Sequence, residues 1–381
     1  MDSKAMRTED KKRAWAEIKL QNIRHNYEVI RATLPAGCRF LGVVKADAYG
    51  HGALRVSQLL QEVGADYLAV AGLDEALELR AAGITMPILI LGHTSARYTK
   101  ILIDNNITQT VTCLAKAEEY SRSARALGGE LAIHIKVDTG MGRLGFLVEG
   151  ELGREGVEHI AKSCTLPGLR AEGIYTHFAV SDEPDEASRD FTHEQFDLFM
   201  RVIGELEAAH GVTFEIRHCA NTGAVLDYPE MALDMVRPGL LLYGYGDLQN
   251  KLDLRPCMRF AATVSTIKHY EAGTSISYGR RFVTSRHTRM GVISAGYADG
   301  LPRISSGKCT YWTENGPAPQ CGNICMDMCM VDLTDAPQTG VGSEVEIFGE
   351  NCSIYQISEA AGTIPYELLC GVSKRVPRVY E

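Results

Sequence analysis

The chain has 381 residues, of which 45% are hydrophobic and 23% charged, and its formal net charge is −9. The acidic balance argues against nucleic acid as the main partner, because phosphate backbones are bound by clustered Lys and Arg. No apolar run reaches the roughly 18 residues that a membrane span needs, and the polar start is not typical of a signal peptide. The composition predicts a soluble globular protein, and the length predicts two domains.

The eleven cysteines are scattered and include no CxxC pair. This usage predicts reduced thiols in a cytoplasmic protein. Cys321, Cys325 and Cys329 recur at every fourth position, a spacing that would allow a metal site. The methionines between them favour a buried strand pair instead, so we expect no bound metal.

Residues 1–13 are charged and aperiodic, which indicates a tail or linker, and 14–20 alternates like a strand. From there to residue 248, strand-like apolar runs alternate with helix-like runs, a pattern that implies a parallel sheet. Eight such units in about 210 residues predict a closed (β/α)8 barrel. The expected strands are Phe40–Val44, Tyr67–Val70, Ile88–Leu91, Ile107–Thr112, Leu131–Val137, Leu169–Tyr175, Phe214–His218 and Leu233–Val236, and the expected helices include Leu54–Val63, Leu73–Ala82, Ala115–Leu127 and Phe191–Ala209.

Residues 249–381 follow a different pattern, in which strand-like runs are separated by Gly, Pro and Asn. This predicts a second, mainly β domain with which the strand at 14–20 could pack. The expected elements are strands at Thr263–His269, Met290–Ser294, Ile324–Leu333 and Val345–Phe348, and helical periodicity over Ser353–Leu369.

Lys45 stands at the end of the first predicted barrel strand, and Tyr49 follows four residues later. Lysine is rarely buried completely, so this position needs a physical reason. Its stem could pack against the strand while the ammonium reaches water. Alternatively, it could be a covalent anchor, because an amine in a desolvated pocket loses its proton more easily and can form a Schiff base.

Further polar residues follow the other predicted strands, and active sites of this barrel lie at the carboxyl ends of the strands. Several lysines, arginines and histidines are therefore expected to meet at one mouth of the barrel, and such a concentration of cationic groups indicates an anionic ligand. The segments Asn221–Thr222 and Gly239–Leu240 could hold a phosphate through side-chain and backbone donors, aided by the N-termini of the helices that follow. The charged and histidine side chains at the strand ends are Lys45, Lys136, Asp138, Arg143, His177, His218 and Arg237.

The run Gly140–Gly145 also matches GxGxxG, which would suggest a dinucleotide site. Such a fingerprint should open the first βαβ unit and be followed by an acidic residue at the end of the next strand. Here the run lies in the fifth unit, and the next strand ends near His177. The other interpretation is a tight turn that directs Arg143 inward.

Taken together, these segments resemble the alanine racemase family of fold-type III pyridoxal-phosphate enzymes. The resemblance implies pyridoxal 5′-phosphate as cofactor, a homodimer with active sites shared between subunits, and racemisation of alanine that supplies D-alanine for peptidoglycan. Its motifs keep their order from residue 14 to residue 381. They are Val44–Gly52, Lys136–Gly145, His177–Ala179, His218–Asn221, Val236–Gly239, Ile276–Gly279, Gly296–Gly300, Ile324–Asp327 and Arg375–Arg378.

The resemblance implies two catalytic bases, Lys45 on one face of the substrate and the partner subunit's Tyr278 on the other. Racemisation requires this arrangement, because a proton is removed from one side of Cα and returned on the other. Lys45 would also hold the cofactor covalently. Other cofactor contacts implied by the resemblance are Tyr49, Arg143, His177, Asn221, Thr222, Arg237, Gly239 and Leu240, and the substrate would be bounded by Arg143, Met326, Asp327 and Tyr297.

The resemblance has further implications at three positions. Arg237 would face the pyridine nitrogen, and a guanidinium cannot take its proton, so the ring would stay neutral and would be a weaker electron sink. Lys136 aligns with a lysine that is carbamylated in some relatives, which would make it an anion beside Arg143. Lys374 stands where some relatives carry a tyrosine before the last Arg-Val-Pro-Arg motif, which leaves substrate preference open.

Other functions remain open at this point. The chain could be a serine racemase domain of the vancomycin-resistance type, in which such a domain follows a membrane domain; residues 1–13 would then suit an excised linker. It could also be a cofactor-binding protein without racemase activity, or a decarboxylase with the same barrel. Tyr278 argues against a mere binding protein, because a bare barrel would lack the second base.

Overall fold

The computed structural model describes residues 13–247 and 250–381. The predicted tail therefore lies outside the described residues, except for Arg13. The chain forms two compact units, one of residues 24–48 and 53–254, and one that combines 49–52 and 255–381 with the N-terminal segment up to Ile23. We call them the barrel unit and the β unit. No helix within the described ranges has the length and apolarity to cross a membrane.

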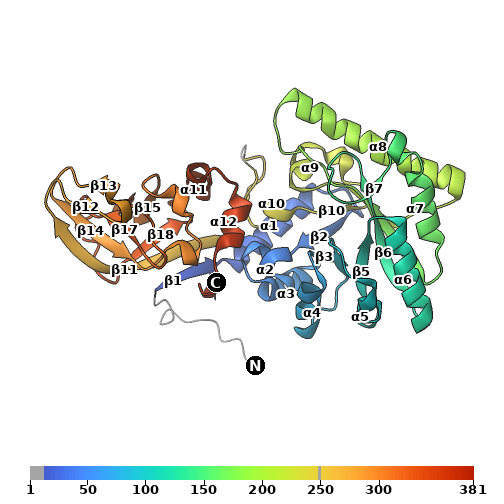
Figure 1. The fold of residues 1–381 in the computed structure, drawn as a ribbon, viewed down its shortest axis with the longest axis horizontal. Coiled ribbons are helices and arrows are strands. Elements are labelled where there is room, and N and C mark those ends of the chain that lie inside the picture. Colours follow the sequence, from blue (N-terminus) through green and yellow to red (C-terminus); the bar gives the residue numbers. More distant parts are fainter. Residues whose placement is uncertain (1–12, 248–249) are drawn as a thin grey trace. The chain divides into compact units, whose positions relative to one another are not determined.

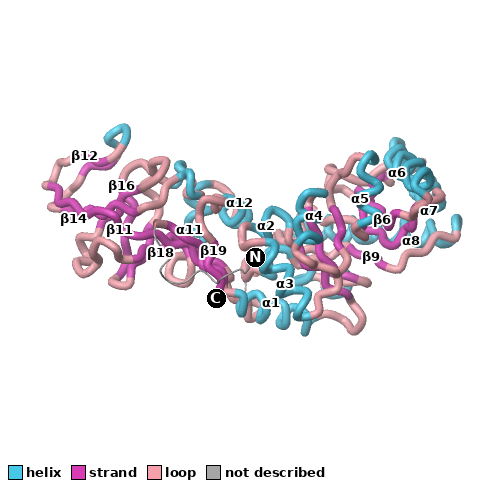
Figure 2. Tube along the Cα trace, turned by 90° about the horizontal axis from the view of Figure 1, so that it is seen from below, coloured by secondary structure: helices cyan, strands magenta, loops and turns pink. Residues whose placement is uncertain are grey.

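The barrel unit contains a parallel sheet with helices around it, and this confirms the predicted fold class (Figures 1 and 2). The strand order is β10-β2-β3-β4-β5-β6-β8-β9. β3 and β4 are buried along their whole length, as expected for parallel strands that are covered on both faces. The strands are β2 Arg39–Val43, β3 Tyr67–Val70, β4 Ile88–Ile90, β5 Ile107–Val111, β6 Leu131–Asp138, β8 Leu169–Tyr175, β9 Ile216–His218 and β10 Met235–Val236.

The barrel is nearly closed. β10 pairs with β2, whereas β9 and β10 are joined by single backbone hydrogen bonds, from Asp234 N to Arg217 O at 3.0 Å and from Arg237 N to Ala220 O at 2.9 Å. The first bond lies just before β10, and the second lies just after both strands, at the carboxyl side of the sheet where a (β/α)8 barrel places its chemistry.

Helices alternate with the strands, as predicted. The longest, α8, begins five residues before its predicted start, because its first turn is polar and carries no apolar periodicity. Asp185 caps it by accepting from Ser188 N at 3.0 Å. The helices up to the end of the barrel are α1 Leu20–Thr33, α3 Ala53–Val63, α4 Leu73–Ala81, α5 Thr99–Asp104, α6 Leu114–Leu127, α7 Gly156–Thr165, α8 Glu186–His210, α9 Thr222–Asp227 and α10 Gly239–Leu242.

The β unit is built on an eight-stranded sheet in the order β14-β17-β16-β15-β18-β11-β1-β19. The N-terminal strand β1 belongs to it, pairing antiparallel with β11 and parallel with β19. A small hairpin, β12 Ser275–Ile276 with β13 Phe282–Val283, carries Tyr278 at its turn. The strands of the large sheet are β1 Ala14–Ile18, β11 Met258–Tyr270, β14 Thr288–Ile293, β15 Thr310–Thr313, β16 Gly316–Cys321, β17 Cys329–Asp332, β18 Glu344–Phe348 and β19 Arg378–Tyr380.

Two predictions for the β unit are wrong in detail. The predicted strand Ile324–Leu333 is a strand only from Cys329, because its first half forms a loop next to Gly296–Gly300. The single helical run Ser353–Leu369 is two helices, α11 Ile354–Ala361 and α12 Pro365–Gly371, separated where Gly362 adopts a positive φ of 67°. Cys321 and Cys329 lie in the paired strands β16 and β17.

Candidate active site

Lys45 begins a left-handed turn at the carboxyl end of β2. The turn, α2 Lys45–Tyr49, has φ angles of 51°, 55°, 54° and 50° at residues 46–49, all in the left-handed region. L-residues resist this region at about 1–2 kcal/mol each, so the turn must be held by its surroundings. Because of this turn, the chain after Lys45 does not continue directly into a right-handed helix, and the half-buried Lys45 lies at the barrel mouth.

Two carboxylates hold this turn. Glu75, at the start of α4, accepts from Ala46 N at 2.8 Å with one oxygen and from Ala71 N at 2.6 Å with the other. Asp47 accepts from Ala53 N at 2.7 Å and so ties the turn to the start of α3. Glu75 thus links the turn that follows Lys45 to the loop that follows the neighbouring strand β3.

We expect Glu75→Ala to destabilise the barrel by about 1–3 kcal/mol, because two backbone donors lose their acceptor and the strained turn loses a restraint. The measurement is the free energy of unfolding from denaturant titration. Asp74→Ala is the matched control, since Asp74 lies in the same first turn of α4 and shares any effect on the helix dipole. An equal loss in both variants would contradict this role for Glu75.

The glycine-rich run after β6 folds back on its own strand. β7 Phe146–Leu147 pairs parallel with Val137 and Asp138, so no helix opens here, and the dinucleotide interpretation is wrong. Asp138 accepts from Gly140 N and Gly142 N at 3.1 and 3.0 Å, and this closes the loop. Gly145 has a φ of 130°, and a Cβ there would lie 2.6 Å from Asp138 N, so only glycine fits.

The loop carries Arg143, which is exposed at its tip. Its charge acts on two groups at the mouth. Burial, Arg237 and Arg143 together lower the pKa of Lys136 to about 7. Burial and the charges of Arg237, Lys136 and Arg143 hold the pKa of His177 well below its usual value. The predicted convergence of cations at the mouth is thus present within the barrel unit.

Arg237 is the buried centre of this group. Its Nη1 donates to His218 Nδ1 at 3.0 Å, and its Nη2 donates to the carbonyls of Thr176 at 2.8 Å and Cys219 at 3.0 Å. The guanidinium also lies 5.3 Å from the centre of the Tyr175 ring. Among the described residues no carboxylate forms an ion pair with it, which is unusual for a buried cation.

A chain of histidines extends from Arg237 into the barrel. His218 Nε2 lies 2.9 Å from His134 Nδ1, and His134 Nε2 lies 3.4 Å from Glu172 Oε2. Burial lowers the pKa of both imidazoles, so both are neutral. His218 then accepts from Arg237 at Nδ1 and donates from Nε2 to His134 Nδ1, while His134 Nε2 faces Glu172 without a close hydrogen bond. Tyr67 completes it by donating to Glu172 Oε2 at 2.7 Å.

The residues predicted from the sequence did not include His134, Glu172 or Tyr67. The signal for His134 was its spacing of two from Lys136, which puts both side chains on one face of β6. Glu172 gave no signal, because it enters the network through a bulge, where β8 skips from Ala171 to Gly173 in its pairing with β6.

The two segments expected to hold a phosphate are tied to each other. Thr222 Oγ1 accepts from Leu240 N at 3.1 Å, which joins the start of α9 to the start of α10. Asn221 Oδ1 accepts from Ser181 Oγ at 2.7 Å and from Ala224 N at 3.2 Å. Gly239 N donates to Arg237 O at 2.9 Å. The two segments are therefore adjacent, and these bonds fix their backbones relative to each other.

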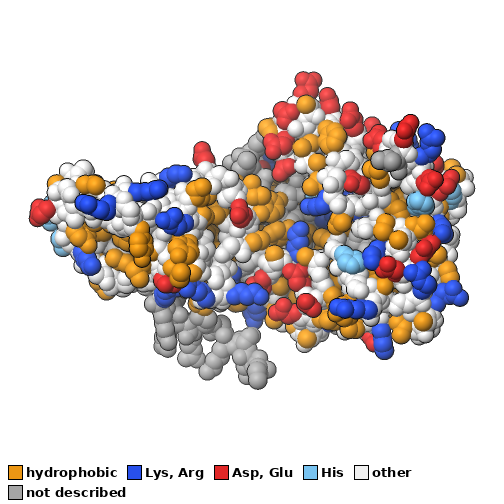
Figure 3. Space-filling view, viewed as in Figure 1, with side chains coloured by type: hydrophobic (Ala, Val, Ile, Leu, Met, Phe, Trp, Pro, Cys, Tyr) orange, Lys and Arg blue, Asp and Glu red, His pale blue; other side chains and the backbone are white. Residues whose placement is uncertain are grey.

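The remaining predicted residues lie in the β unit. Tyr278 is 71% exposed, and Tyr297 and Met326 are also exposed, which is unusual for large apolar side chains so close together in one unit. Figure 3 shows hydrophobic side chains reaching the surface of this unit. Asn323 Nδ2 donates to Tyr278 O at 2.6 Å and fixes the hairpin turn beneath the phenol. Asp327 is half-exposed and pairs with Arg375 at 2.9 Å.

Tyr49 reveals a further residue that the sequence analysis missed. Its buried ring meets that of Tyr366 edge to face, with centroids 5.7 Å apart. Burial raises the pKa of the Tyr49 phenol, so it stays protonated and can donate a hydrogen bond. Lys374, which stands where some relatives carry a tyrosine, is exposed on the turn before β19.

Comparisons with known proteins agree along the whole chain. The family model "Alanine racemase, N-terminal domain" matches residues 18–247, and "Alanine racemase, C-terminal domain" matches residues 257–380. An alanine racemase of Desulfosudis oleivorans is 42% identical over 379 residues, which cover 96% of each chain. An alanine racemase of Desulforamulus reducens is 42% identical over 371 residues, 96% of this chain and 98% of its own.

Solved structures give the same result. Alanine racemase of Clostridium difficile superimposes with a TM-score of 0.90 at 38% identity, covering 97% of this chain and 95% of that one. A Bacillus anthracis alanine racemase with bound L-Ala-P superimposes with a TM-score of 0.88 at 32% identity, covering 97% and 95%. With the barrel, the β unit and both family models in agreement, this chain belongs to the alanine racemase family.

Proposed function

We infer that this chain is a pyridoxal-phosphate-dependent racemase that interconverts L- and D-alanine. The observation that carries the inference is Arg237, a buried guanidinium bound by histidine and carbonyl groups and not by a carboxylate. Its hydrogen bonds to other described residues run from Nη1 and Nη2, which leaves Nε–H available to face a ring nitrogen that stays unprotonated. This suits the cofactor named by the sequence resemblance, and the activity is that of the relatives above.

The chain's own residues supply the remaining parts. Lys45 would bind the cofactor covalently, and Tyr49 with the tied segments Asn221–Thr222 and Gly239–Leu240 would hold its phosphate. When bound, the cofactor supplies the electron sink for the substrate's Cα. Lys45 Nζ would then remove or return the α-proton on one face, while the Tyr278 phenol would serve the other.

We propose that Tyr278 serves the active site of a second copy of this chain, so that the working form is a homodimer. The exposure of Tyr278, Tyr297 and Met326 supports this, because a partner would cover them. Sedimentation should show a dimer that holds all the activity, and a fully active monomer would contradict the proposal. We also propose that the enzyme acts in the cytoplasm and supplies D-alanine for peptidoglycan.

Purified holoenzyme tests the function directly. We expect conversion of L-alanine to D-alanine and the reverse, with Cα hydrogen exchanged for deuterium in heavy water. Cofactor absorbance without any such exchange would contradict racemase activity and favour a mere binding protein. Comparing kcat/KM for L-alanine and L-serine addresses the serine racemase alternative, which we do not favour because the relatives above are alanine racemases.

We propose that Lys136 is carbamylated. Burial and Arg237 lower the pKa of its amine to about 7, so above that pH the neutral amine can attack CO2, forming an N–C bond and releasing one proton. We expect a carbamate signal in 13C NMR of protein equilibrated with 13CO2, rising from pH 6 to pH 8 and absent in Lys136→Arg. The exposed Lys100 provides the control variant Lys100→Arg, which should keep the signal. If wild-type protein equilibrated with 13CO2 at pH 8 gave no carbamate signal, the proposal would be refuted.

A further inference from the structure

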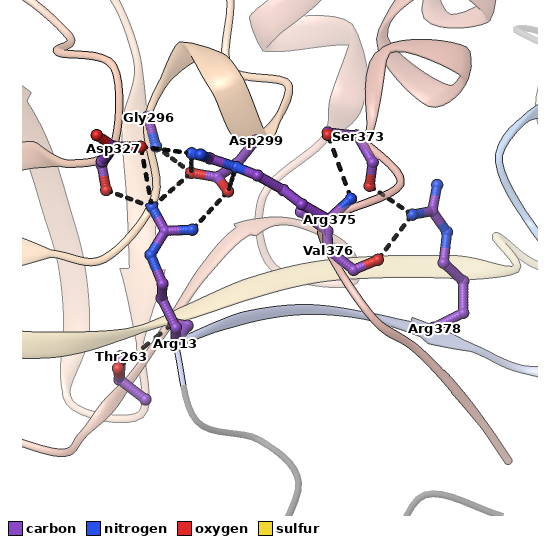
Figure 4. Close-up of polar contacts among 9 residues, drawn as sticks. All are labelled: Arg13, Thr263, Gly296, Asp299, Asp327, Ser373, Arg375, Val376 and Arg378. Carbon is purple, nitrogen blue, oxygen red and sulfur yellow. Dashed lines mark hydrogen bonds and ion pairs between the residues drawn. The ribbon is translucent and has the colours of Figure 1, made fainter.

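The β unit contains a four-residue ion cluster that joins four segments of the chain (Figure 4). Asp299, at the end of the short helix Tyr297–Asp299, has a completely buried carboxylate. Arg13, just before β1, binds it through Nη1 and Nη2 at 2.7 and 3.0 Å. Arg375, just before β19, binds the same two oxygens through Nε and Nη2 at 2.8 and 3.0 Å.

The same two arginines hold the segment predicted to face the substrate. Arg13 Nη2 donates to the backbone oxygen of Asp327 at 2.7 Å. Arg375 Nη2 lies 2.9 Å from the Asp327 carboxylate. Each guanidinium therefore bridges the buried Asp299 and the half-exposed Asp327, and the charges of two arginines and two aspartates balance.

The backbone completes the connection. Asp299 Oδ2 accepts from Gly296 N at 2.9 Å, Tyr297 N donates to Cys325 O at 2.9 Å, and Ala298 N donates to Met326 O at 3.0 Å. A Cβ at Gly296 would lie 2.3 Å from Cys325 O, so the two loops approach as closely as a glycine allows. The loops that carry Tyr297 and Met326–Asp327 are thus hydrogen-bonded to each other, and Asp299 binds to the backbone of the first of them.

Asp299 keeps its charge in this setting. Burial would raise the pKa of its carboxyl, but the hydrogen bonds from Arg375 and Arg13 outweigh that effect and hold the pKa below its usual value. An anion is thus permanently available to both arginines, and bidentate pairing fixes the planes of both guanidinium groups.

We propose that Asp299 is a positioning residue, which acts through Arg13 and Arg375 to set the place of Met326–Asp327 and Tyr297 against the substrate. This proposal rests on the proposed function, which assigns those residues to the substrate. Displacing a substrate-facing segment by about 1 Å can cost about 100-fold in kcat/KM, so a group that touches no substrate can still control how the substrate is held.

The variants Asp299→Asn and Arg13→Gln test the proposal. In the holoenzyme we expect kcat/KM for L-alanine to fall by about 100-fold in Asp299→Asn and about 10-fold in Arg13→Gln, mainly through a higher KM. Arg286→Gln is the matched control, because it removes one exposed arginine from the same unit, where Arg286 pairs with Asp335. A purely structural role would lower the melting temperature without moving KM.

Amide hydrogen exchange gives a second readout that needs no activity. We expect exchange at Tyr297 and Ala298, whose N–H groups bond to the Met326 segment, to speed up by about tenfold in both variants and to stay unchanged in Arg286→Gln. Unchanged exchange and an unchanged KM would overturn the proposal. If Asp299→Asn does not fold, Arg13→Gln decides by the same two readouts. If the wild type does not racemise alanine, the proposed function fails, and hydrogen exchange alone decides whether Asp299 positions the loops.

Discussion

Lys45→Ala is expected to lose racemase activity by at least about 10⁴-fold, because one substitution removes both the covalent anchor of the cofactor and one of the two bases. The same protein should lose its covalently bound cofactor, which is measured as absorbance that survives gel filtration. The fold should persist, since Lys45 is half-buried and the turn behind it is held by Glu75 and Asp47.

Lys45→Arg separates the charge of Lys45 from its chemistry. Arginine keeps the positive charge but is not deprotonated in proteins, so it can neither form the bond nor accept the α-proton. We expect it to be as inactive as Lys45→Ala, whereas Lys100→Ala, on the exposed surface, should keep full activity. If either Lys45 variant racemised alanine at a tenth of the wild-type rate or more, the assignment of Lys45 as anchor and base would be wrong.

Tyr278→Phe should lower racemisation by about 10²- to 10⁴-fold, the range that one general acid–base group contributes. It should leave the cofactor bound, because Lys45 is intact. Since Lys45 still serves one face, the α-proton of one enantiomer of alanine should continue to exchange in heavy water, while the other enantiomer exchanges far more slowly. Proton NMR of both enantiomers in heavy water measures the two rates.

Tyr270→Phe is the matched control, because Tyr270 lies in the same unit and packs against the small core of Ile276, Met290 and Cys321. It should leave both exchange rates unchanged. If Tyr278→Phe instead slowed exchange of both enantiomers equally, Tyr278 would be a structural residue and the two-base scheme would be wrong. Because the Tyr278 side chain is exposed, its phenol oxygen can be removed without disturbing the core of the β unit.

Local sequence patterns determined the barrel. Apolar runs at the right spacing predicted all eight of its strands, because strands covered on both faces must be nearly continuous in apolar residues. The same patterns placed Lys45, Lys136, His177 and Arg237 at strand ends, since in a parallel barrel every strand ends at the same mouth. The glycine-rich run was ambiguous, because only its pairing back onto β6 distinguishes a tight turn from a fingerprint.

The tertiary structure decided features that depend on partners far away in the chain. Residues 46–48 are Ala-Asp-Ala, whose propensities give no hint of a left-handed turn, and Glu75 holds it from 29 positions away. Glu172 reaches His134 only because a bulge redirects it. Arg13 pairs with Asp299, 286 positions away, so no local sequence pattern predicts the ion cluster that holds Met326–Asp327. Short-range periodicity in the sequence indicates which face of an element is buried. Strained turns, bulges and ion pairs depend on which other elements it contacts, and only the folded chain determines those contacts.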